Sequence, residues 1–271
     1  TSAKYTRMIA LELERLYNHI ADVGGIATDV AFIFGAARAG ILREKIVQLN
    51  EELTGSRFLR GLVVPGGVTK DIFPAREKIL STLKEVGKEF RELVDILYSS
   101  ASFMDRVRTT GVIAKKTVED LGIVGVPARA AGVDIDMRRD APYEAYCEVE
   151  FKVPVYTQGD VFARLAVRID EVYESIRIIE QVLSKKPQGD LKIDIKELKP
   201  HRFALGCAEG WRGSIVYWMM TATQGRLYRC KIKDPSFSNW PGLSYAVRRN
   251  IVPDFPLCNK SFNLSYSGND L

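Results

Sequence analysis

The stretch YTRMIALELERLYNHIADV, residues 5–23, decides the fold class. Apolar residues recur in it at steps of three or four, which places them along one face of an α-helix. That face is formed by Ile9, Leu13, Leu16, Ile20 and Val23. The rest of the helix surface, which we expect to meet water, carries Arg7, Glu14, Arg15 and Asn18. The chain therefore opens with a long amphipathic helix.

Three further runs have the same period. One follows FGAARAG from Ile41 to Leu49 and ends near Gly55, and one runs from Leu80 through Leu97 and is predicted to continue to Arg108. The last starts after Asp160, a suitable N-cap, and reaches Leu183. Two β-rich runs, Gly213–Thr223 and Arg226–Lys233, are joined by Gln224 and Gly225 and predict a hairpin. The fold class is mainly α with a small β hairpin region, a helical bundle in a single domain over residues 1–271.

Irregular segments separate these elements. Pro65, Gly66 and Gly67 mark a loop, and residues 186–198 are predicted to form a surface connection. Residues 124–160 are rich in glycine and proline and have little periodicity. Because loops of that length are usually functional or linkers, and this one contains aromatic and β-branched residues, we expect it to be ordered and functional.

Composition excludes several classes of protein. The net charge of +5 comes from 39 basic and 34 acidic residues that are interspersed, so a nucleic-acid surface is not predicted. The longest apolar run, residues 23–37, contains Asp29 and is shorter than the roughly 18 residues needed to cross a bilayer. The sequence starts with Thr-Ser-Ala, and we interpret it as the later part of a longer polypeptide.

Common catalytic and metal motifs are missing from the sequence. The four cysteines never form C-x-x-C, which argues against a zinc ribbon or a disulfide framework and favours a reducing, cytoplasmic compartment. There are two histidines, and H-E-x-x-H, G-x-S-x-G, G-x-G-x-x-G and G-K-[ST] do not occur. Hydrolase, P-loop and dinucleotide-fold functions therefore lose their usual support, and no metal site is predicted.

Polar residues inside apolar surroundings are the remaining candidates. His19 falls among apolar residues of the first helix, and Asp29 stands alone in the apolar run. A buried carboxylate costs several kcal/mol unless it is paired or protonated, so Asp29 is expected to have a partner or a raised pKa. The alternative for Asp29 is a helix N-cap or a satisfied polar residue of the core.

Two short motifs are also candidates. In DMRRDAPY, Arg138 and Arg139 stand beside Asp140 and form either a solvated salt-bridge cluster or the lining of a site. In EGWRG, Glu209 and Arg212 flank a tryptophan where the hairpin starts, and either line a site or pin the turn.

Six blocks, in order, resemble one family. It comprises the large subunits of membrane-bound [NiFe] hydrogenases and formate hydrogenlyases, together with their relative in respiratory complex I, the D-type subunit of NADH-quinone oxidoreductase. The likeness covers nearly the whole chain and implies a hydrogenase-large-subunit-like helical bundle. The blocks are RMIALELERLYNHIADVG, LTGSRFLRGLVVPGGVTKDI, ARAAGVDIDMRRDAPYEAY, VPVYTQGDVFARLAVRIDEVYESIRIIEQVL, EGWRGSIVYWMMTATQGRLYRCKIKDPSF and NIVPDFPLCNKSFNLSYSGNDL.

The C-terminal tail SFNLSYSGNDL departs from the metal-bearing members of that family. Their tails resemble S-x-D-P-C-x-x-C, whose two thiolates hold nickel and iron, and here Ser265 and Gly268 stand at the cysteine positions. A serine alkoxide forms far less readily than a thiolate, and glycine offers no ligand. We therefore expect no [NiFe] centre and no cofactor held by this chain alone. Without the family resemblance, the tail is predicted to be a last strand or an ordered extension.

The resemblance to complex I implies partners and site residues. It implies an iron-sulfur small subunit that carries the cluster, membrane-embedded subunits, and a quinone at the interface, on the cytoplasmic side of the inner membrane. It places Asp29 near the quinone cavity, and Arg138 and Arg139 near the cluster of the partner subunit, where they would raise its potential. His19 would help to fix the helical core.

Three functions follow for testing. The first is a subunit of an NADH:quinone-oxidoreductase-like complex that docks on the iron-sulfur subunit and shapes an acceptor cavity, with Asp29 coupling reduction to proton movement. The second is a non-catalytic scaffold subunit, which predicts that side chains fill the space near Ser265 and Gly268. The third, hydrogen chemistry, would need nickel.

Overall fold

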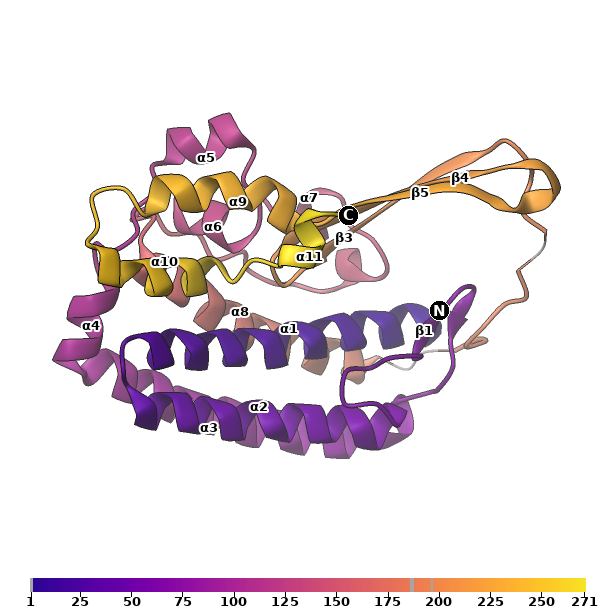
Figure 1. Ribbon diagram of the computed structural model, residues 1–271. Helices are drawn as coiled ribbons and strands as arrows, with labels where there is room; N and C mark the ends of the chain where they lie inside the picture. Colours follow the sequence, from indigo (N-terminus) through magenta and orange to yellow (C-terminus); the bar gives the residue numbers. More distant parts are fainter. Residues whose placement is uncertain (1, 186–187, 196) are drawn as a thin grey trace.

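Four long helices form the main bundle of the chain. The computed structural model describes residues 2–185, 188–195 and 197–271. Helix α1 (Ser2–Asp29) packs against both α2 (Ile33–Thr54) and α8 (Val161–Ser184), and α2 packs against α3 (Arg76–Ser99) (Figure 1). The predicted fold class is confirmed.

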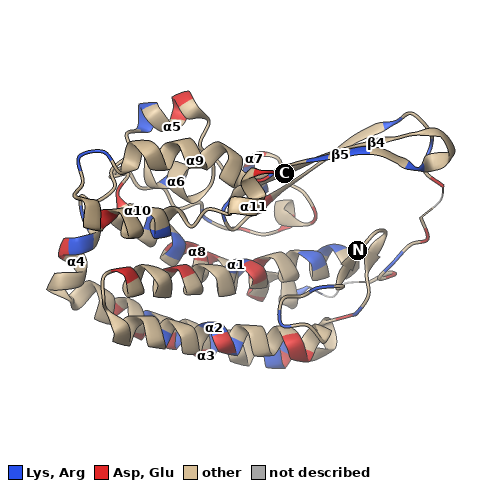
Figure 2. Ribbon diagram, viewed as in Figure 1, with Lys and Arg blue, Asp and Glu red and all other residues tan. Residues whose placement is uncertain are grey.

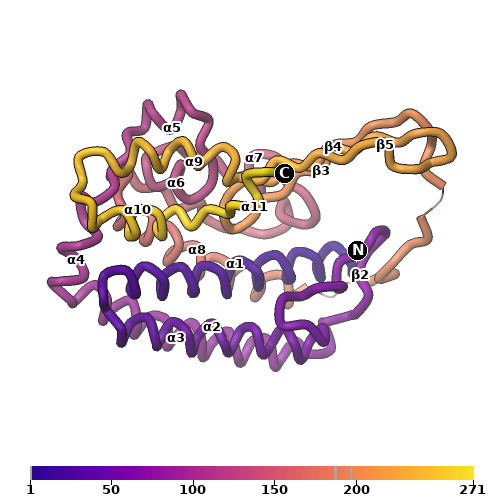
Figure 3. The backbone as a smooth tube through the Cα atoms, in the orientation of Figure 1, coloured from indigo at the N-terminus to yellow at the C-terminus, as the bar shows by residue number. Residues whose placement is uncertain are grey.

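A second layer of shorter helices covers the α1 and α8 side of the bundle (Figures 1 and 3). Within it, α6 packs on α8, α10 packs on α1 and α8, and the C-terminal α11 packs on α9. The α-helices outside the bundle are α4 (Ala101–Val107), α5 (Lys115–Leu121), α6 (Val126–Ala130), α7 (Met137–Asp140), α9 (Pro235–Ala246), α10 (Phe255–Phe262) and α11 (Tyr266–Asn269). Single 3-10 turns are η1 (Phe73–Ala75), η2 (Tyr146–Glu148), η3 (Thr223–Gly225) and η4 (Val252–Asp254). Of the two forms expected for the tail, the strand is wrong and the ordered extension is confirmed, since the tail is the end of α10 and the short α11, which packs on α9.

The predicted start of α8 and the predicted end of α2 are confirmed, whereas α2 begins at Ile33, before the predicted Ile41. Asp160 caps α8, because its Oδ1 atom accepts a hydrogen bond of 2.8 Å from the Ala163 amide. Gly55 ends α2 in the left-handed conformation, with φ of 82°. The helix expected to continue to Arg108 instead stops at Ser99, since the Ser100 hydroxyl accepts a hydrogen bond from the Phe103 amide and starts α4.

Among the described residues, two antiparallel sheets interrupt the helices. A small hairpin of β1 (Val63–Val64) and β2 (Gly67–Val68) lies in the predicted Pro-Gly-Gly loop. The larger sheet has the order β3-β4-β5 and projects away from the bundle (Figure 1). Its strands are β3 (Phe203–Gly210), β4 (Gly213–Thr221) and β5 (Leu227–Lys233). The predicted hairpin is the β4–β5 pair, and β3 was not predicted.

The linker and surface predictions have mixed outcomes. Lys186, Pro187 and Lys196 of the surface connection lie outside the described residues, and the described part of it is exposed apart from a half-buried Leu191.

The core holds the predicted apolar face of α1, with Leu13, Leu16 and Ile20 at 0% exposure. In the portion of the chain that the structure describes, no helix has the length and apolar character needed to cross a membrane.

Candidate functional site

A network of buried ionic side chains lies where α1, α6, α7, α8 and the root of β3 meet. Arg15, Arg129 and Arg138 are essentially unexposed, and the carboxylates of Glu12, Asp136, Glu171 and Glu209 lie among them. The prediction that Arg15 lies on the surface is therefore wrong. We call these seven residues and His19 the buried network.

Glu171 of α8 occupies the middle of the network. Its Oε1 atom accepts a hydrogen bond of 2.7 Å from Arg129 Nη2, and its Oε2 atom lies 2.7 Å from His19 Nε2 and 3.5 Å from Arg15 Nη1. Burial alone would raise the pKa of this carboxyl, but Arg129 and the hydrogen bond with His19 hold it well below its usual value. Glu171 is therefore an anion that ties α1 to α6 and α8.

Glu12 of α1 is a second anion with four partners. It accepts hydrogen bonds of 3.2 Å from Arg138 Nη1, 2.5 Å from the Tyr146 hydroxyl and 2.6 Å from the Ser175 hydroxyl, and it lies 3.2 Å from Arg15 Nε. Burial would raise the pKa of Glu12, but Arg15 and Arg138 lower it below the ordinary value. Full satisfaction of a buried carboxylate is what makes its burial tolerable.

Glu209 joins the root of the sheet to the network. Its side-chain Oε1 accepts a hydrogen bond of 3.0 Å from Arg129 Nη1, and its backbone carbonyl accepts one of 2.6 Å from Arg15 Nη2. Burial raises the pKa of Glu209, although Arg129 opposes the shift. The network thus holds four carboxylates against three guanidiniums, and Glu209 is the carboxyl that is least favoured as an anion.

The two adjacent arginines of DMRRDAPY lie in different environments. Arg138 is buried and donates to Asp136 at 2.7 Å as well as to Glu12. Arg139 is exposed and pairs with Asp134 at 2.6 Å and with Asp140 at 2.7 Å. The two interpretations left open therefore apply to different parts of the motif. Arg139 and Asp140 form the solvated cluster, and Arg138 lines the buried network. Whether either one acts on a partner's cluster stays a prediction.

His19 makes the network sensitive to pH. Its Nδ1 atom is buried without a hydrogen-bond partner in the described structure, and Nε2 faces Glu171. Burial lowers the pKa of His19, and Glu171 only partly opposes this. The pKa of His19 is lower in the folded state than in the unfolded state, so on acidification the unfolded state takes up the His19 proton first. The stabilisation that neutral His19 provides is therefore present above the unfolded pKa of about 6.5 and is lost as the pH falls below that value.

We expect the free energy of unfolding to decrease between pH 7.5 and 5.5, and His19→Gln to remove most of that decrease, because glutamine keeps an N–H for Glu171 but does not titrate. His201→Gln is the matched control, since His201 is exposed and lies outside the network. Urea denaturation at several pH values measures this. Equal pH dependence in the His19→Gln variant and the unmodified chain would contradict the assignment.

The tail is bound to the bundle through Asn263. Its side-chain amide donates a hydrogen bond of 2.5 Å to Asp22 of α1, which also accepts one of 2.7 Å from Arg168 of α8. Its backbone carbonyl accepts a hydrogen bond of 2.6 Å from Arg212 Nε. Arg212 therefore fastens the turn between β3 and β4 to the tail, so it pins the turn and also borders the tail.

Ser265 and Gly268 are occupied by structural roles. The Ser265 hydroxyl accepts a hydrogen bond of 2.9 Å from the Gly268 amide and caps α11. A Cβ atom at Gly268 would lie 2.7 Å from Asp234 Cγ, so the Asp234 carboxylate fills the space that a side chain at position 268 would need. Among the residues described, no three His, Cys, Asp or Glu side chains are grouped to hold a metal ion. The residues at the tail do not fit a nickel–iron centre.

This packing gives a second prediction. Gly268→Ala should lower the free energy of unfolding by about 1–3 kcal/mol, the cost of overpacking, because it displaces the carboxylate that caps α9. Gly40→Ala is the control: it lies exposed inside α2 with no atom within 4 Å of the added Cβ, and should stabilise by about 1 kcal/mol. Thermal denaturation distinguishes them. A neutral Gly268→Ala variant would show that the space is free.

Asp29 ends α1 at the opposite end from its N-terminus and is half-buried. Burial raises its pKa, and Lys260 of α10 partly offsets the shift. This shift has the direction expected from the sequence, whereas the N-cap alternative is wrong because Asp29 is the last residue of a helix. Four and five residues farther along the chain, at the start of α2, Ile33 and Phe34 are 67% and 56% exposed. Asp29 is therefore close in the sequence to an exposed apolar pair.

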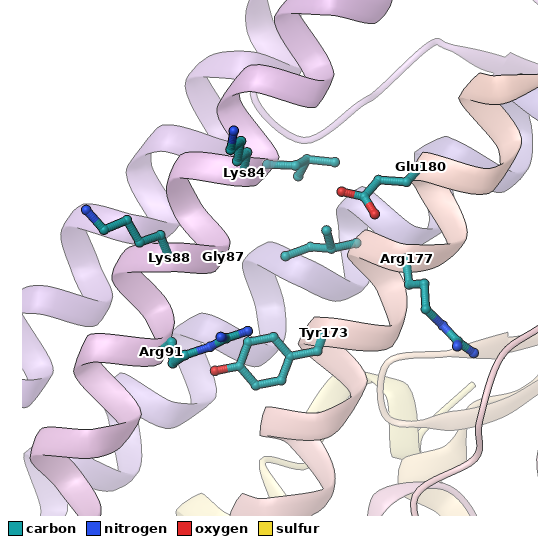
Figure 4. A pocket seen from close by; sticks show the side chains of 9 residues that line it. Lys84, Gly87, Lys88, Arg91, Tyr173, Arg177 and Glu180 are labelled. Carbon is teal, nitrogen blue, oxygen red and sulfur yellow. The ribbon is translucent and has the colours of Figure 1, made fainter.

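Asp29 does not line any of the hollows given for the described residues, and two of these hollows concern the tail and the bundle. One, of about 710 Å³ and lined by Leu121, Phe237 and Trp240 among others, borders the tail. The other is a groove of about 430 Å³ between α3 and α8, where the Arg91 guanidinium lies 5.8 Å from the centre of the Tyr173 ring (Figure 4). The groove contains none of the predicted site residues.

Sequence reasoning missed Glu12, Arg129 and Glu171. A signal was present in α1, where polar residues recur at steps of three or four directly beside the apolar face. This polar stripe consists of Glu12, Arg15, His19 and Asp22. Arg129 and Glu171 carry no comparable signal, because each becomes buried only through the long-range meeting of α6 and α8 with α1.

Comparisons with known proteins agree with this fold. The family described as respiratory-chain NADH dehydrogenase, 49 Kd subunit, matches residues 22–204. Formate hydrogenlyase subunit 5 of Escherichia coli K12 is 34% identical over 99% of this chain and 47% of its own length. The 49 kDa subunit of NADH-ubiquinone oxidoreductase from Reclinomonas americana is 30% identical over 93% of this chain and 71% of its own.

A solved structure is similar as well. A chain of the membrane-bound sulfane sulfur reductase, an archaeal respiratory membrane complex, superposes with a TM-score of 0.92 at 26% identity, covering 99% of this chain and 75% of that one. This chain covers about half the length of the formate hydrogenlyase relative.

Proposed function

Because the chain belongs to the family of the 49 kDa subunit of respiratory-chain NADH dehydrogenase, we propose that it is a subunit of a membrane-associated oxidoreductase complex that works without a nickel–iron centre. The observation that carries the proposal is the tail. Ser265 serves as a helix cap, and Asp234 fills the space at Gly268, so the two positions that resemble the thiolate positions of the metal-bearing members offer no thiolate.

In this proposal the chain docks on an iron-sulfur subunit and forms one wall of a cavity for a quinone or a similar acceptor. Asp29 and the exposed Ile33 and Phe34 form that wall. An apolar surface beside a single carboxyl suits a quinone headgroup, which needs apolar contact and a proton donor upon reduction. Covering this surface would bury Asp29 further and raise its pKa more, which favours the protonated form that donates.

The experiment is quinone reduction by the assembled complex. Asp29→Asn should lower the turnover number at least tenfold while assembly is retained, because asparagine keeps the shape and cannot supply the proton. Asp105→Asn, an exposed carboxylate on α4, is the control and should be unchanged. Phe237→Ala tests whether the hollow beside the tail, and not the wall at Asp29, is needed for quinone reduction. Full activity of Asp29→Asn, or a loss confined to Phe237→Ala, would refute the assignment of the wall.

The second candidate is a scaffold subunit of a hydrogenase- or formate-hydrogenlyase-like complex. One observation favours it: the carboxylate of Asp234 already fills the space at Gly268, as a decayed site would require. It predicts a complex whose turnover is unaffected by both Asp29→Asn and Phe237→Ala. The same activity series therefore distinguishes the two functions.

A further inference from the structure

The three-stranded sheet forms an arm that leaves both of its faces uncovered by this chain. We define the arm as residues 203–233. It projects beyond the bundle (Figure 1); the root residues Glu209 and Gly210 are buried on β3, and the two end residues Gly213 and Thr221 are buried on β4. On β3, Phe203 and Leu205 are 72% and 64% exposed, and on β5 Tyr228 is 70% exposed. These are large apolar side chains in contact with water.

The register of the strands separates the two faces, since residues directly opposite each other share a face. Phe203 pairs with Met220 and Leu205 with Trp218, while Lys231 lies opposite Trp218 on the other side. The first face therefore carries apolar residues beside a row of cations on β5. That row consists of Arg229, Lys231 and Lys233. The second face carries no charge, and its residues include Ala204, Gly206, Tyr217, Met219, Cys230 and Ile232.

An exposed antiparallel sheet usually has one packed face and one polar face. Neither condition is met by the arm, because neither face packs on the bundle and one has no charged residue. Cations on alternate residues of one strand lie about 7 Å apart and repel one another. Within the described ranges, Arg229, Lys231 and Lys233 form no ion pair, and Figure 2 shows basic residues along β5. The arm therefore has apolar area and positive charge that its own chain leaves unsatisfied.

The backbone decides which kind of surface can cover the arm. In the described structure β3 and β5 are the outer strands of the sheet, so each has one edge whose N–H and C=O groups pair with no further strand. At the root, the Glu209 N–H donates to the Tyr143 hydroxyl and the Glu209 carbonyl accepts from Arg15. A bilayer interior cannot satisfy open sheet edges, whereas a protein can pair with them or hydrogen-bond to them. A flat partner covers one face, but a protein that encloses the arm covers both.

We propose that the arm is clasped by another protein subunit, which lays an apolar surface on the uncharged face and sets Asp or Glu carboxylates against Arg229, Lys231 and Lys233. This rests on the proposed function only in requiring a multi-subunit complex. Burial of the apolar side chains supplies most of the affinity, and the carboxylates supply register and specificity.

Zero-length cross-linking of the purified native complex tests the carboxylates, because a carbodiimide joins a lysine amine to a carboxylate only at contact distance. We expect links from Lys231 or Lys233 to Asp or Glu of one other subunit. A photo-reactive phenylalanine analogue in place of Tyr217 should react with protein on the uncharged face. Lipid adducts, no adducts, or amine labelling of Lys231 at the same rate in the complex and in the isolated chain would overturn the proposal.

A pair of charge-reversal substitutions gives the quantitative test. Arg229→Glu with Lys231→Glu should reduce co-purification of the cross-linked subunit at least tenfold, whereas Lys88→Glu on α3, also exposed, should not change it. Because the reversed side chains are exposed, circular dichroism and the melting temperature of the isolated chain should be unchanged, which separates lost docking from lost folding. An arm that cross-links in a complex indifferent to Asp29→Asn would uphold the docking and refute the acceptor wall.

Discussion

Replacing Arg129 with methionine should lower the free energy of unfolding by about 3–5 kcal/mol, the cost of removing one partner from a buried ion pair. The guanidinium is fully buried and holds Glu171 at 2.7 Å and Glu209 at 3.0 Å. Without the Arg129 guanidinium, the Glu171 and Glu209 carboxylates lose a positive charge that offsets their mutual repulsion. The Ile135 carbonyl also loses the donor that lies 3.1 Å from it. Urea denaturation of the isolated chain at pH 7.5 measures the loss.

Two companion variants separate charge from packing. Arg139→Met removes an exposed guanidinium that also contacts two carboxylates, and should cost about 1 kcal/mol or less because water screens that cluster. Adding Glu209→Gln to Arg129→Met should recover part of the stability, since it removes one of the uncompensated anions. A loss below about 1 kcal/mol for Arg129→Met alone would show that the network contributes little to stability.

Gly125→Ala is the second substitution with a large expected effect. Gly125 has φ of 69° and ψ of −144°, a conformation open almost only to glycine, and an added Cβ would lie 2.1 Å from the Arg212 carbonyl oxygen. Backbone strain of about 1–3 kcal/mol and overpacking of about 1–3 kcal/mol add to a loss near 4 kcal/mol. The clash occurs where the loop before α6 meets the turn between β3 and β4, so the arm should also be displaced.

Gly122→Ala is the matched control. Gly122 also has positive φ, at 63°, but no atom lies within 4 Å of the added Cβ. It should cost about 1–2 kcal/mol, the penalty of the left-handed conformation alone. Thermal denaturation of both variants measures the difference in their loss of stability, and amide hydrogen exchange of β3 and β4 measures the displacement of the arm. Equal losses in the two variants would contradict the close approach of the arm root to the loop before α6.

Local sequence signals predicted the helices well, because α1, α3 and α8 each have an apolar stripe of helical period and α8 has its aspartate cap. The failures have physical causes. The apolar period of α3 runs on through Ser100, but Ser100 caps α4 and ends the continuous helix. Strand β3 lacks the alternation of apolar and polar residues that marks a strand, because its side chains are exposed on both faces.

The candidate site was predicted only in part. Arg138 and Glu209 were named from their motifs, but Arg15 was assigned to the surface because an arginine beside an apolar stripe is usually solvated. Its burial depends on Glu12 and Glu171, which come from α1 and α8. Ion pairs between helices that are distant in the sequence cannot be predicted from the local pattern of residues. The family resemblance inferred from the six sequence blocks is confirmed, and the roles of Asp29 and Arg139 remain predictions.

Elemental analysis of the purified native complex decides whether the tail of this chain holds nickel. We expect iron from the partner's cluster and fewer than about 0.1 nickel atoms per copy of this chain, because Ser265 is a helix cap and Asp234 fills the space at Gly268. Close to one nickel per copy would show that the tail binds the metal and would refute the proposed function.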